Sequence, residues 1–207
     1  AAYAEAKLRD IGYFTLVNGY KRLLRDPSTG KYRADSSFSD LVALYEFDSS
    51  LRELFSHSLS YVERKMRSVV SYSFCDKHGE AQCAYLDPAN YSTSKKHAKG
   101  IARLTQLLDA LANRNTDHGY LVHYRTNHGN VPLWVLVNAT TFGQISKMYS
   151  FLAPSEKSAV SRQFSFANEK KLEQFLKVLV LFRNVCAHGE RLLTHTTHSV
   201  IPDTNLH

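Results

Sequence analysis

The sequence contains little cysteine and a single tryptophan. Its 207 residues include only three cysteines, Cys75, Cys83 and Cys186, and no Cys-x-x-Cys pair. An odd number without such a pair argues against a disulfide scaffold and favours reduced thiols in a cytoplasm. A zinc site built from Cys75, His78 and Cys83 would lack the paired short spacings of structural zinc sites, so we expect no metal.

Long hydrophobic runs and the common catalytic loops are absent as well. The longest apolar stretches cover residues 133–137 and 178–182, far below the roughly 18 residues of a membrane-spanning helix. No signal-peptide pattern opens the chain, and because it begins at Ala1 without Met we expect further residues before it. Phosphate-binding loops, Gly-x-Ser-x-Gly, His-Glu-x-x-His and Gly-x-Gly-x-x-Gly are missing, so hydrolase, kinase and dehydrogenase functions have no support and we expect no cofactor. The short apolar runs predict no membrane association.

What is present is the composition of a globular, basic protein. Hydrophobic residues make up 43% and charged residues 22% of the chain, which is typical of a folded domain. Lys and Arg number 26 against 19 Asp and Glu, a net charge of +7. Such a surplus favours a polyanion such as RNA, DNA or anionic lipid, although a basic surface also serves solubility alone.

Helical periodicity dominates and predicts an all-α fold in a single domain over residues 1–207. We expect helices over residues 2–8, 39–75 with a bend or break near Asp48-Ser49-Ser50, 92–113, 120–126 and 168–187. Residues 194–207 have no apolar periodicity and are expected to form a loosely ordered tail. His195 and His198 lie in this tail, so we assign them no role.

The last helix ends in polar residues. Its apolar seam has spacings of 3, 4, 3 and 4 and consists of Leu172, Phe175, Leu179, Phe182 and Cys186. A second stripe carries Lys177, Leu181, Asn184 and His188. Polar groups at the end of a hydrophobic helix cost free energy unless they are satisfied or used. This helix end is therefore the candidate functional site.

The string Arg183-Asn184-x3-His188 resembles the Arg-x4–6-His signature of HEPN domains. Further segments are similar to the Abi-like (abortive infection) branch of that group, and they cover residues 8–20, 44–52, 62–68, 133–147 and 186–192. One departure is that Leu193-Thr194-His195 follows Leu192, where the family would continue with an Asn. The resemblance implies a helical-bundle HEPN domain and places its site at Arg183, Asn184 and His188.

A HEPN site implies metal-independent cleavage of RNA by attack of the 2′-OH, which leaves a 2′,3′-cyclic phosphate. Imidazole can act as acid or base near neutral pH, and a guanidinium suits phosphate oxygens. The resemblance also implies a homodimer in which two such sites face one cleft. It further implies a toxin in bacterial abortive-infection defence against phage, with an RNA or protein antitoxin as a possible partner.

Other interpretations stay open. The chain could be a HEPN-type module that binds RNA or protein without cutting, or a regulator or nucleotide-transfer target in a toxin–antitoxin pair. His188 could cap the helix, and Arg183 could pair with Glu63 or Glu173. Glu63 and Arg67 are expected to form a structural pair. Outside the motif, the candidate RNA-binding residues are Arg191, Lys177, Lys95 and Lys96.

Overall fold

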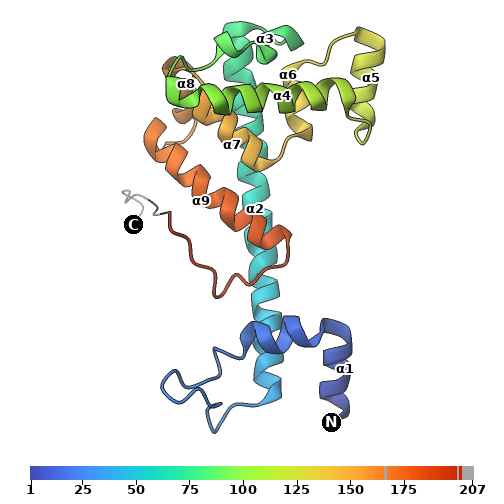
Figure 1. Ribbon diagram of the computed structural model, residues 1–207, viewed down its shortest axis with the longest axis vertical. Helices are drawn as coiled ribbons and strands as arrows, with labels where there is room; N and C mark the ends of the chain where they lie inside the picture. Colours follow the sequence, from blue (N-terminus) through green and yellow to red (C-terminus); the bar gives the residue numbers. More distant parts are fainter. Residues whose placement is uncertain (166, 200, 202–207) are drawn as a thin grey trace. The chain divides into compact units, whose positions relative to one another are not determined.

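The computed structural model describes residues 1–165, 167–199 and 201 (Figure 1). The described part is helical without strands, apart from one isolated antiparallel bridge between Arg25 and Tyr32, so the predicted all-α fold is confirmed. Two compact units are distinguished. Unit 1 comprises Ala1–Ser58 and Phe182–Thr196, and unit 2 comprises Leu59–Leu181 with the described residues after Thr196. The expectation of a single domain stays a prediction.

Unit 1 is built from α1 (Ala2–Ile11), the π-helix η1 (Phe14–Asn18), the first half of α2 (Phe38–His78) and the end of α9 (Glu169–Ala187). Its small core consists of Leu16, Tyr20, Leu41 and Val42. Helix α2 begins in a reciprocal cap. The Asp40 amide donates to the Ser37 hydroxyl, and the Ser37 amide donates to the Asp40 carboxylate at 2.7 Å, which satisfies donors that a helix start leaves free.

Of the bend or break expected near Asp48-Ser49-Ser50, the break is wrong, because α2 runs unbroken for 41 residues. Asp and Ser often end helices since their side chains compete for backbone groups. Here both side chains are bonded in ways that leave the helix intact. The Ser50 hydroxyl donates to the Glu46 carbonyl, and the Asp48 carboxylate accepts from Arg52 one turn later. The helix ends at His78, three residues beyond the predicted end, where Gly79 adopts a positive φ of 83°, a conformation that glycine supplies at helix ends.

Unit 2 contains the remaining helices. They are α3 (Gln82–Leu86), η2 (Pro88–Asn90), η3 (Lys95–His97), α4 (Ala98–Arg114), α5 (Gly119–His128), α6 (Leu133–Leu136), η4 (Val137–Ala139), α7 (Phe142–Phe151) and α8 (Pro154–Ser161). Within this unit α4 runs across the direction of α2 (Figure 1). Side chains from α2, α4, α7 and α9 share one hydrophobic core, represented by Met66, Leu108, Ile145 and Leu176.

Helix α4 starts later than expected. The sequence predicts a start at Ser92 or Thr93, but the α-helix begins at Ala98 after a 3₁₀ turn. Its buried residues, Ile101, Leu104, Thr105, Leu108 and Ala112, follow the spacing of an amphipathic helix, and this spacing is what made the helix predictable.

Candidate active site at the end of helix α9

Helix α9 ends in a Schellman turn, which fixes the place of His188. The Glu190 amide donates to the Val185 carbonyl at 2.9 Å, and the Gly189 amide donates to the Cys186 carbonyl at 3.3 Å. Gly189 has a φ of 64°, the left-handed conformation that this turn requires and that glycine adopts without strain. His188 is therefore the residue at which the helix stops and the chain reverses.

Asn184 and His188 lie on one face of this helix end. They are one turn apart, joined by a backbone hydrogen bond of 2.9 Å from the His188 amide to the Asn184 carbonyl, and both side chains are exposed. At about 100° per residue, their side chains leave the axis about 40° apart, whereas Arg183 lies about 100° from Asn184. Arg183 is half-buried. The His and Asn are thus presented together, whereas Arg183 lies on an adjoining face, about 140° around the helix from His188.

The opposite face of this helix end packs within unit 1. The rings of Phe182 and Phe55 are 6.1 Å apart, and the ring of His195 meets Phe182 edge-on at 5.3 Å. Val185 is buried, and burial raises the pKa of the Cys186 thiol. A neutral, packed cysteine holds the helix in place and is a poor nucleophile.

Asp48 connects α2 to the segment that follows the helix. Its carboxylate is fully buried and accepts from the Tyr20 hydroxyl at 2.6 Å, the Arg52 guanidinium, and the amides of Leu192 and Leu193 at 3.3 and 2.7 Å. Burial, followed by the hydrogen bond to Asp48, raises the pKa of Tyr20 to about 12, so its hydroxyl stays a donor. The network fixes the chain just after the Arg183–His188 motif.

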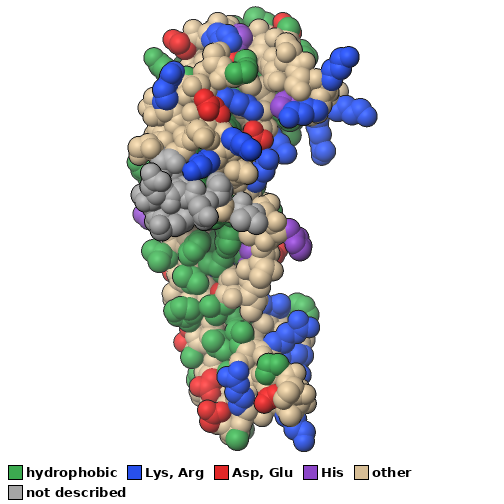
Figure 2. All heavy atoms as spheres, turned by 90° about the vertical axis from the view of Figure 1, so that its left-hand side faces the viewer, with side chains coloured by type: hydrophobic (Ala, Val, Ile, Leu, Met, Phe, Trp, Pro, Cys, Tyr) green, Lys and Arg blue, Asp and Glu red, His purple; other side chains and the backbone are tan. Residues whose placement is uncertain are grey.

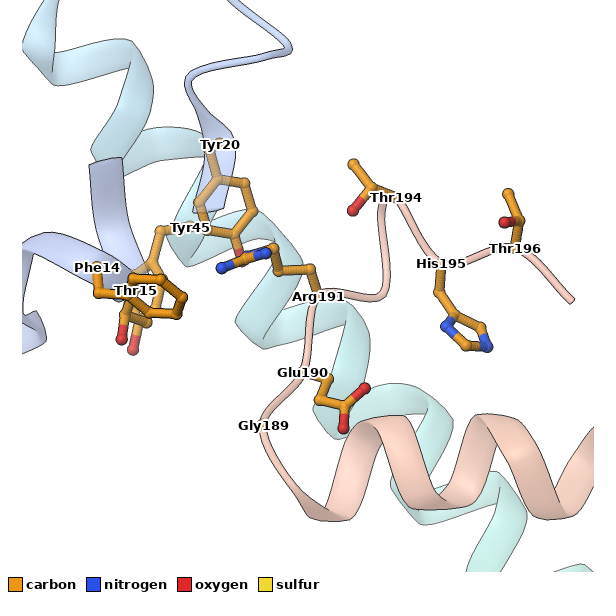
Figure 3. Close-up of a pocket in the computed structure, with 10 residues that line it drawn as sticks. All are labelled: Phe14, Thr15, Tyr20, Tyr45, Gly189, Glu190, Arg191, Thr194, His195 and Thr196. Atoms are coloured by element: carbon orange, nitrogen blue, oxygen red, sulfur yellow. The ribbon is translucent and has the colours of Figure 1, made fainter. Parts of the chain in front are cut away.

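A cavity of about 530 Å³ opens beside this pinned segment. We call it the Phe14 cavity; it is lined by Phe14, Thr15, Tyr20, Tyr45, Gly189, Glu190, Arg191, Thr194, His195 and Thr196 (Figure 3). Figure 3 shows Arg191 reaching from the segment after α9 toward the Phe14 side of the cavity. All ten residues belong to unit 1, and Gly189 directly follows His188.

The position of the Arg191 side chain depends on the absence of a side chain at Gly19. Its guanidinium carbon is 5.8 Å from the centre of the Phe14 ring, within cation–π range. A Cβ built on Gly19 would lie 2.9 Å from the Arg191 Nε. Only glycine at this position leaves room for the side chain in its present place.

The sequence matches the family of Abi-like proteins over residues 6–194. The chain belongs to this family. No curated protein and no solved structure gives a significant match.

The other candidate residues of this Abi-like protein are distributed over both units. Arg191 shares unit 1 with Arg183, Asn184 and His188, whereas Lys177, Lys95 and Lys96 belong to unit 2. Lys177 pairs with Glu173 one turn earlier at 3.3 Å, and Lys95 and Lys96 are exposed on η3. The assignment of all seven as functional residues stays a prediction.

Glu63 and Arg67 form the ion pair that the sequence predicts. The carboxylate of Glu63 is buried and accepts from the Arg67 guanidinium, which also donates to the Thr140 carbonyl at 2.5 Å. Glu173, the other acid considered for Arg183, pairs with Lys157 and Lys177. The Glu63 pair is a structural contact of unit 2.

The zinc arrangement considered for Cys75, His78 and Cys83 does not form. The His78 Nε2 lies 3.0 Å from the buried Glu156 carboxylate instead. Among the residues that the structure describes, no three His, Cys, Asp or Glu side chains are grouped to hold a metal ion. In the same part of the chain, no helix has the length and apolarity to cross a membrane.

Residues of the cavity were mostly missed by sequence reasoning. His195, assigned no role, lines the cavity, and so do Phe14, Tyr20 and Tyr45. The available signal was the aromatic stretch 13–20 with its glycine at position 19. The expected loose tail, 194–207, stays a prediction that falls partly outside the described residues, while Thr194–Thr196 line the cavity.

Proposed function

We propose that this Abi-like protein is a metal-independent endoribonuclease of the HEPN type. In this proposal it acts in the bacterial cytoplasm as a toxin of abortive infection, where the death of an infected cell limits phage. The observation that carries the proposal is the end of α9, where exposed Asn184 and His188 share one face beside Arg183. Arg191, next to the same site, adds a further cation.

The chemistry needs no metal because RNA carries its own nucleophile. The 2′-oxygen attacks the adjacent phosphorus as its proton leaves to a base, and the bond to the 5′-oxygen breaks as an acid protonates that oxygen. His188 supplies the imidazole for one of these proton transfers. Arg183 offers paired donors to the crowded phosphate, where negative charge grows in the transition state. Asn184 orients the phosphate or the imidazole.

A second copy of the chain would complete the site. One imidazole serves one proton transfer at a time, and a two-fold partner supplies a second His188 and Arg183. Unit 1 offers an apolar face for such a partner: Phe47 and Leu54, seven residues apart on α2, are 58% and 63% exposed, and neighbouring Phe55 is 38% exposed. Figure 2 shows hydrophobic side chains gathered on one face of unit 1. A spacing of seven is typical of paired helices, and two-fold dimers are the commonest assemblies.

Cleavage of RNA in the presence of EDTA tests the proposed activity. We expect 2′,3′-cyclic phosphate and 5′-OH ends from the parent protein. His188→Ala and Arg183→Ala should each lose about 10²–10⁴-fold in rate while keeping their circular dichroism, and Asn184→Ala should lose less. A strict requirement for added Mg²⁺ or Mn²⁺, or a His188→Ala variant that cuts like the parent, would exclude this mechanism.

Mixed protomers test the composite site. An Arg183→Ala protomer combined with a His188→Ala protomer should give dimers whose activity differs from that of either parent variant. Mass measurement at micromolar concentration should find a dimer, and Leu54→Glu should dissociate it. A strictly monomeric protein with full activity would contradict the proposal.

A non-cutting RNA-binding module is the second candidate. The observation that favours it is the half-burial of Arg183, since a guanidinium held against the protein is less available to a phosphate. Binding of RNA without any cleavage would support this alternative, in which the protein would regulate a toxin or antitoxin partner.

A further inference from the structure

The Phe14 cavity begins where the proposed catalytic helix ends. Gly189 lines it, and its Cα lies about 3.8 Å from that of His188, since the two residues are consecutive. A volume of about 530 Å³ falls within the roughly 300–1,000 Å³ of small-ligand sites. A group bound here would therefore lie close to the backbone of His188.

The walls of the cavity suit a flat ring. Phe14 lines the cavity, and its side chain is 71% exposed, so a flat ring of a ligand could stack on it. Single-stranded RNA is commonly recognised by stacking its unpaired bases on exposed aromatic rings and guanidinium planes. The Arg191 guanidinium lies over the Phe14 ring, 5.8 Å from its centre, so the ring and the cation are presented together to a base and its phosphate.

One polar atom at the cavity has no partner. The Nε2 of His195 is buried and makes no hydrogen bond within the described part of the chain. The imidazole contacts the Phe182 ring edge-on at 5.3 Å. A buried nitrogen without a partner costs free energy, and a ligand that bonds to it after a shift of the imidazole toward the cavity would remove that cost.

The charges of the cavity select the kind of ligand. Arg191 provides one positive charge, and Glu190 provides one negative charge on the same wall. A polyphosphate would meet the carboxylate at a cost, whereas an uncharged base flanked by a single phosphate would not. The Glu190 carboxylate can also accept from the exocyclic amino group that adenine, cytosine and guanine carry.

We propose that the Phe14 cavity binds one nucleotide of the RNA substrate next to the phosphate that is cut. Its base stacks on Phe14, its phosphate contacts Arg191, and its base or ribose bonds to the His195 Nε2. This inference rests on the proposed ribonuclease function, and it makes Phe14 a determinant of where the RNA is cut.

Binding of a fluorescent single-stranded RNA to the His188→Ala protein tests the cavity without cleavage. Phe14→Ala should weaken binding about 5- to 150-fold, the loss expected for one stacked base, and Phe14→Tyr should restore it. The matched control is Tyr13→Ala, which removes an adjacent aromatic residue that is 61% exposed and does not line the cavity. This control should bind like the His188→Ala protein.

Two further variants examine the polar contacts. Arg191→Ala should weaken binding and lower the slope of log affinity against log salt by about one, as expected for one lost phosphate contact. His195→Phe keeps a ring against Phe182 and removes only the nitrogen, so weaker binding by this variant would identify the Nε2 contact.

Abasic nucleotides locate the bound base in the active protein. In an RNA cut at one bond, a base removed at successive positions should slow cleavage most at a single position beside the cut. In Phe14→Ala that position should lose its special effect, because base and ring act as a pair.

The outcomes separate this inference from the ribonuclease proposal. Phe14-dependent RNA binding without cleavage would overturn the proposed activity and support the cavity. Cleavage and binding that do not change in Phe14→Ala and Arg191→Ala would overturn the cavity alone. Binding of free nucleoside monophosphates that depends on Phe14, together with RNA binding that does not, would overturn the RNA assignment in favour of a free nucleotide.

Discussion

Replacing Asp48 with alanine removes an acceptor on which four donors of unit 1 converge. The carboxylate is fully buried, and the Arg52 side chain beside it is 11% exposed. The variant leaves a buried cation, the Tyr20 hydroxyl and the amides of Leu192 and Leu193 without this acceptor. Breaking a buried ion pair on one side costs about 3–5 kcal/mol, a large part of the roughly 5–15 kcal/mol that stabilise a domain.

Two measurements test how Asp48→Ala affects stability and the segment that follows α9. The free energy of unfolding, taken from denaturant titration, should fall by about 3–5 kcal/mol. Amide exchange of Leu192 and Leu193 should speed up selectively, because their amide protons lose the acceptor. The control is Glu53→Ala on the same helix, whose side chain is exposed and whose loss should change stability by less than about 0.5 kcal/mol.

A double variant separates stability from positioning. In Asp48→Leu/Arg52→Met neither charge remains, and apolar replacement of a buried pair is often neutral for stability. The Leu192 and Leu193 amides stay unbonded in this variant, so RNA cleavage should remain low even where stability recovers. If Asp48→Ala unfolds like Glu53→Ala and exchanges its amides at the parent rate, the carboxylate does not hold this segment.

Three smaller changes examine other parts of the structure. Gly19→Ala should displace the Arg191 side chain, whose Nε lies 2.9 Å from the new Cβ position, and weaken RNA binding without loss of melting temperature; unchanged binding would contradict this role. Glu63→Ala breaks the buried ion pair with Arg67. The free energy of unfolding should fall by about 3–5 kcal/mol, with a smaller effect on cleavage. A loss of cleavage rate without a loss of stability would instead assign Glu63 a catalytic role. Gly189→Ala and Gly30→Ala each place an alanine at a positive φ in open space, which costs about 1–2 kcal/mol of stability. Only Gly189→Ala should slow cleavage; equal cleavage rates in the two variants would show that the turn at Gly189 does not position the site.

The helices were predictable where one periodic face meets one core. The predicted start and end of the last helix, 168 and 187, lie within a residue of α9, because its apolar seam repeats at helical spacing and Asn168 caps it through the Lys171 amide. The break predicted at Asp48 was wrong for a tertiary reason. In the local sequence, Asp48 followed by two Ser is typical of a helix end. The partners that occupy the Asp48 carboxylate, Tyr20 and Leu193, lie far away in the sequence and could not be predicted from it.

The candidate site was predictable only as far as it is local. Arg183, Asn184 and His188 stand within one motif, and a helix end brings them together without help from the rest of the chain. The Phe14 cavity is lined by side chains from residues 14–20 and from residues 189–196. No residue spacing in the sequence predicts that these two segments lie together. His195 was overlooked because a segment without apolar periodicity looks unattached, although the Asp48 carboxylate fixes it two residues earlier.

A helix C-terminus is an unusual place to bind RNA, because its free carbonyls carry about half a negative charge. Glu190 adds a full negative charge at the same end. Arg183 and Arg191 bring two positive charges, which leaves a surplus of only about half a charge in one protomer. A single helix end would therefore attract a phosphate weakly. In the proposed dimer, two copies facing each other would double the positive surplus offered to a phosphate and supply the second imidazole, so both RNA attraction and the two proton transfers of the reaction would gain from the second copy.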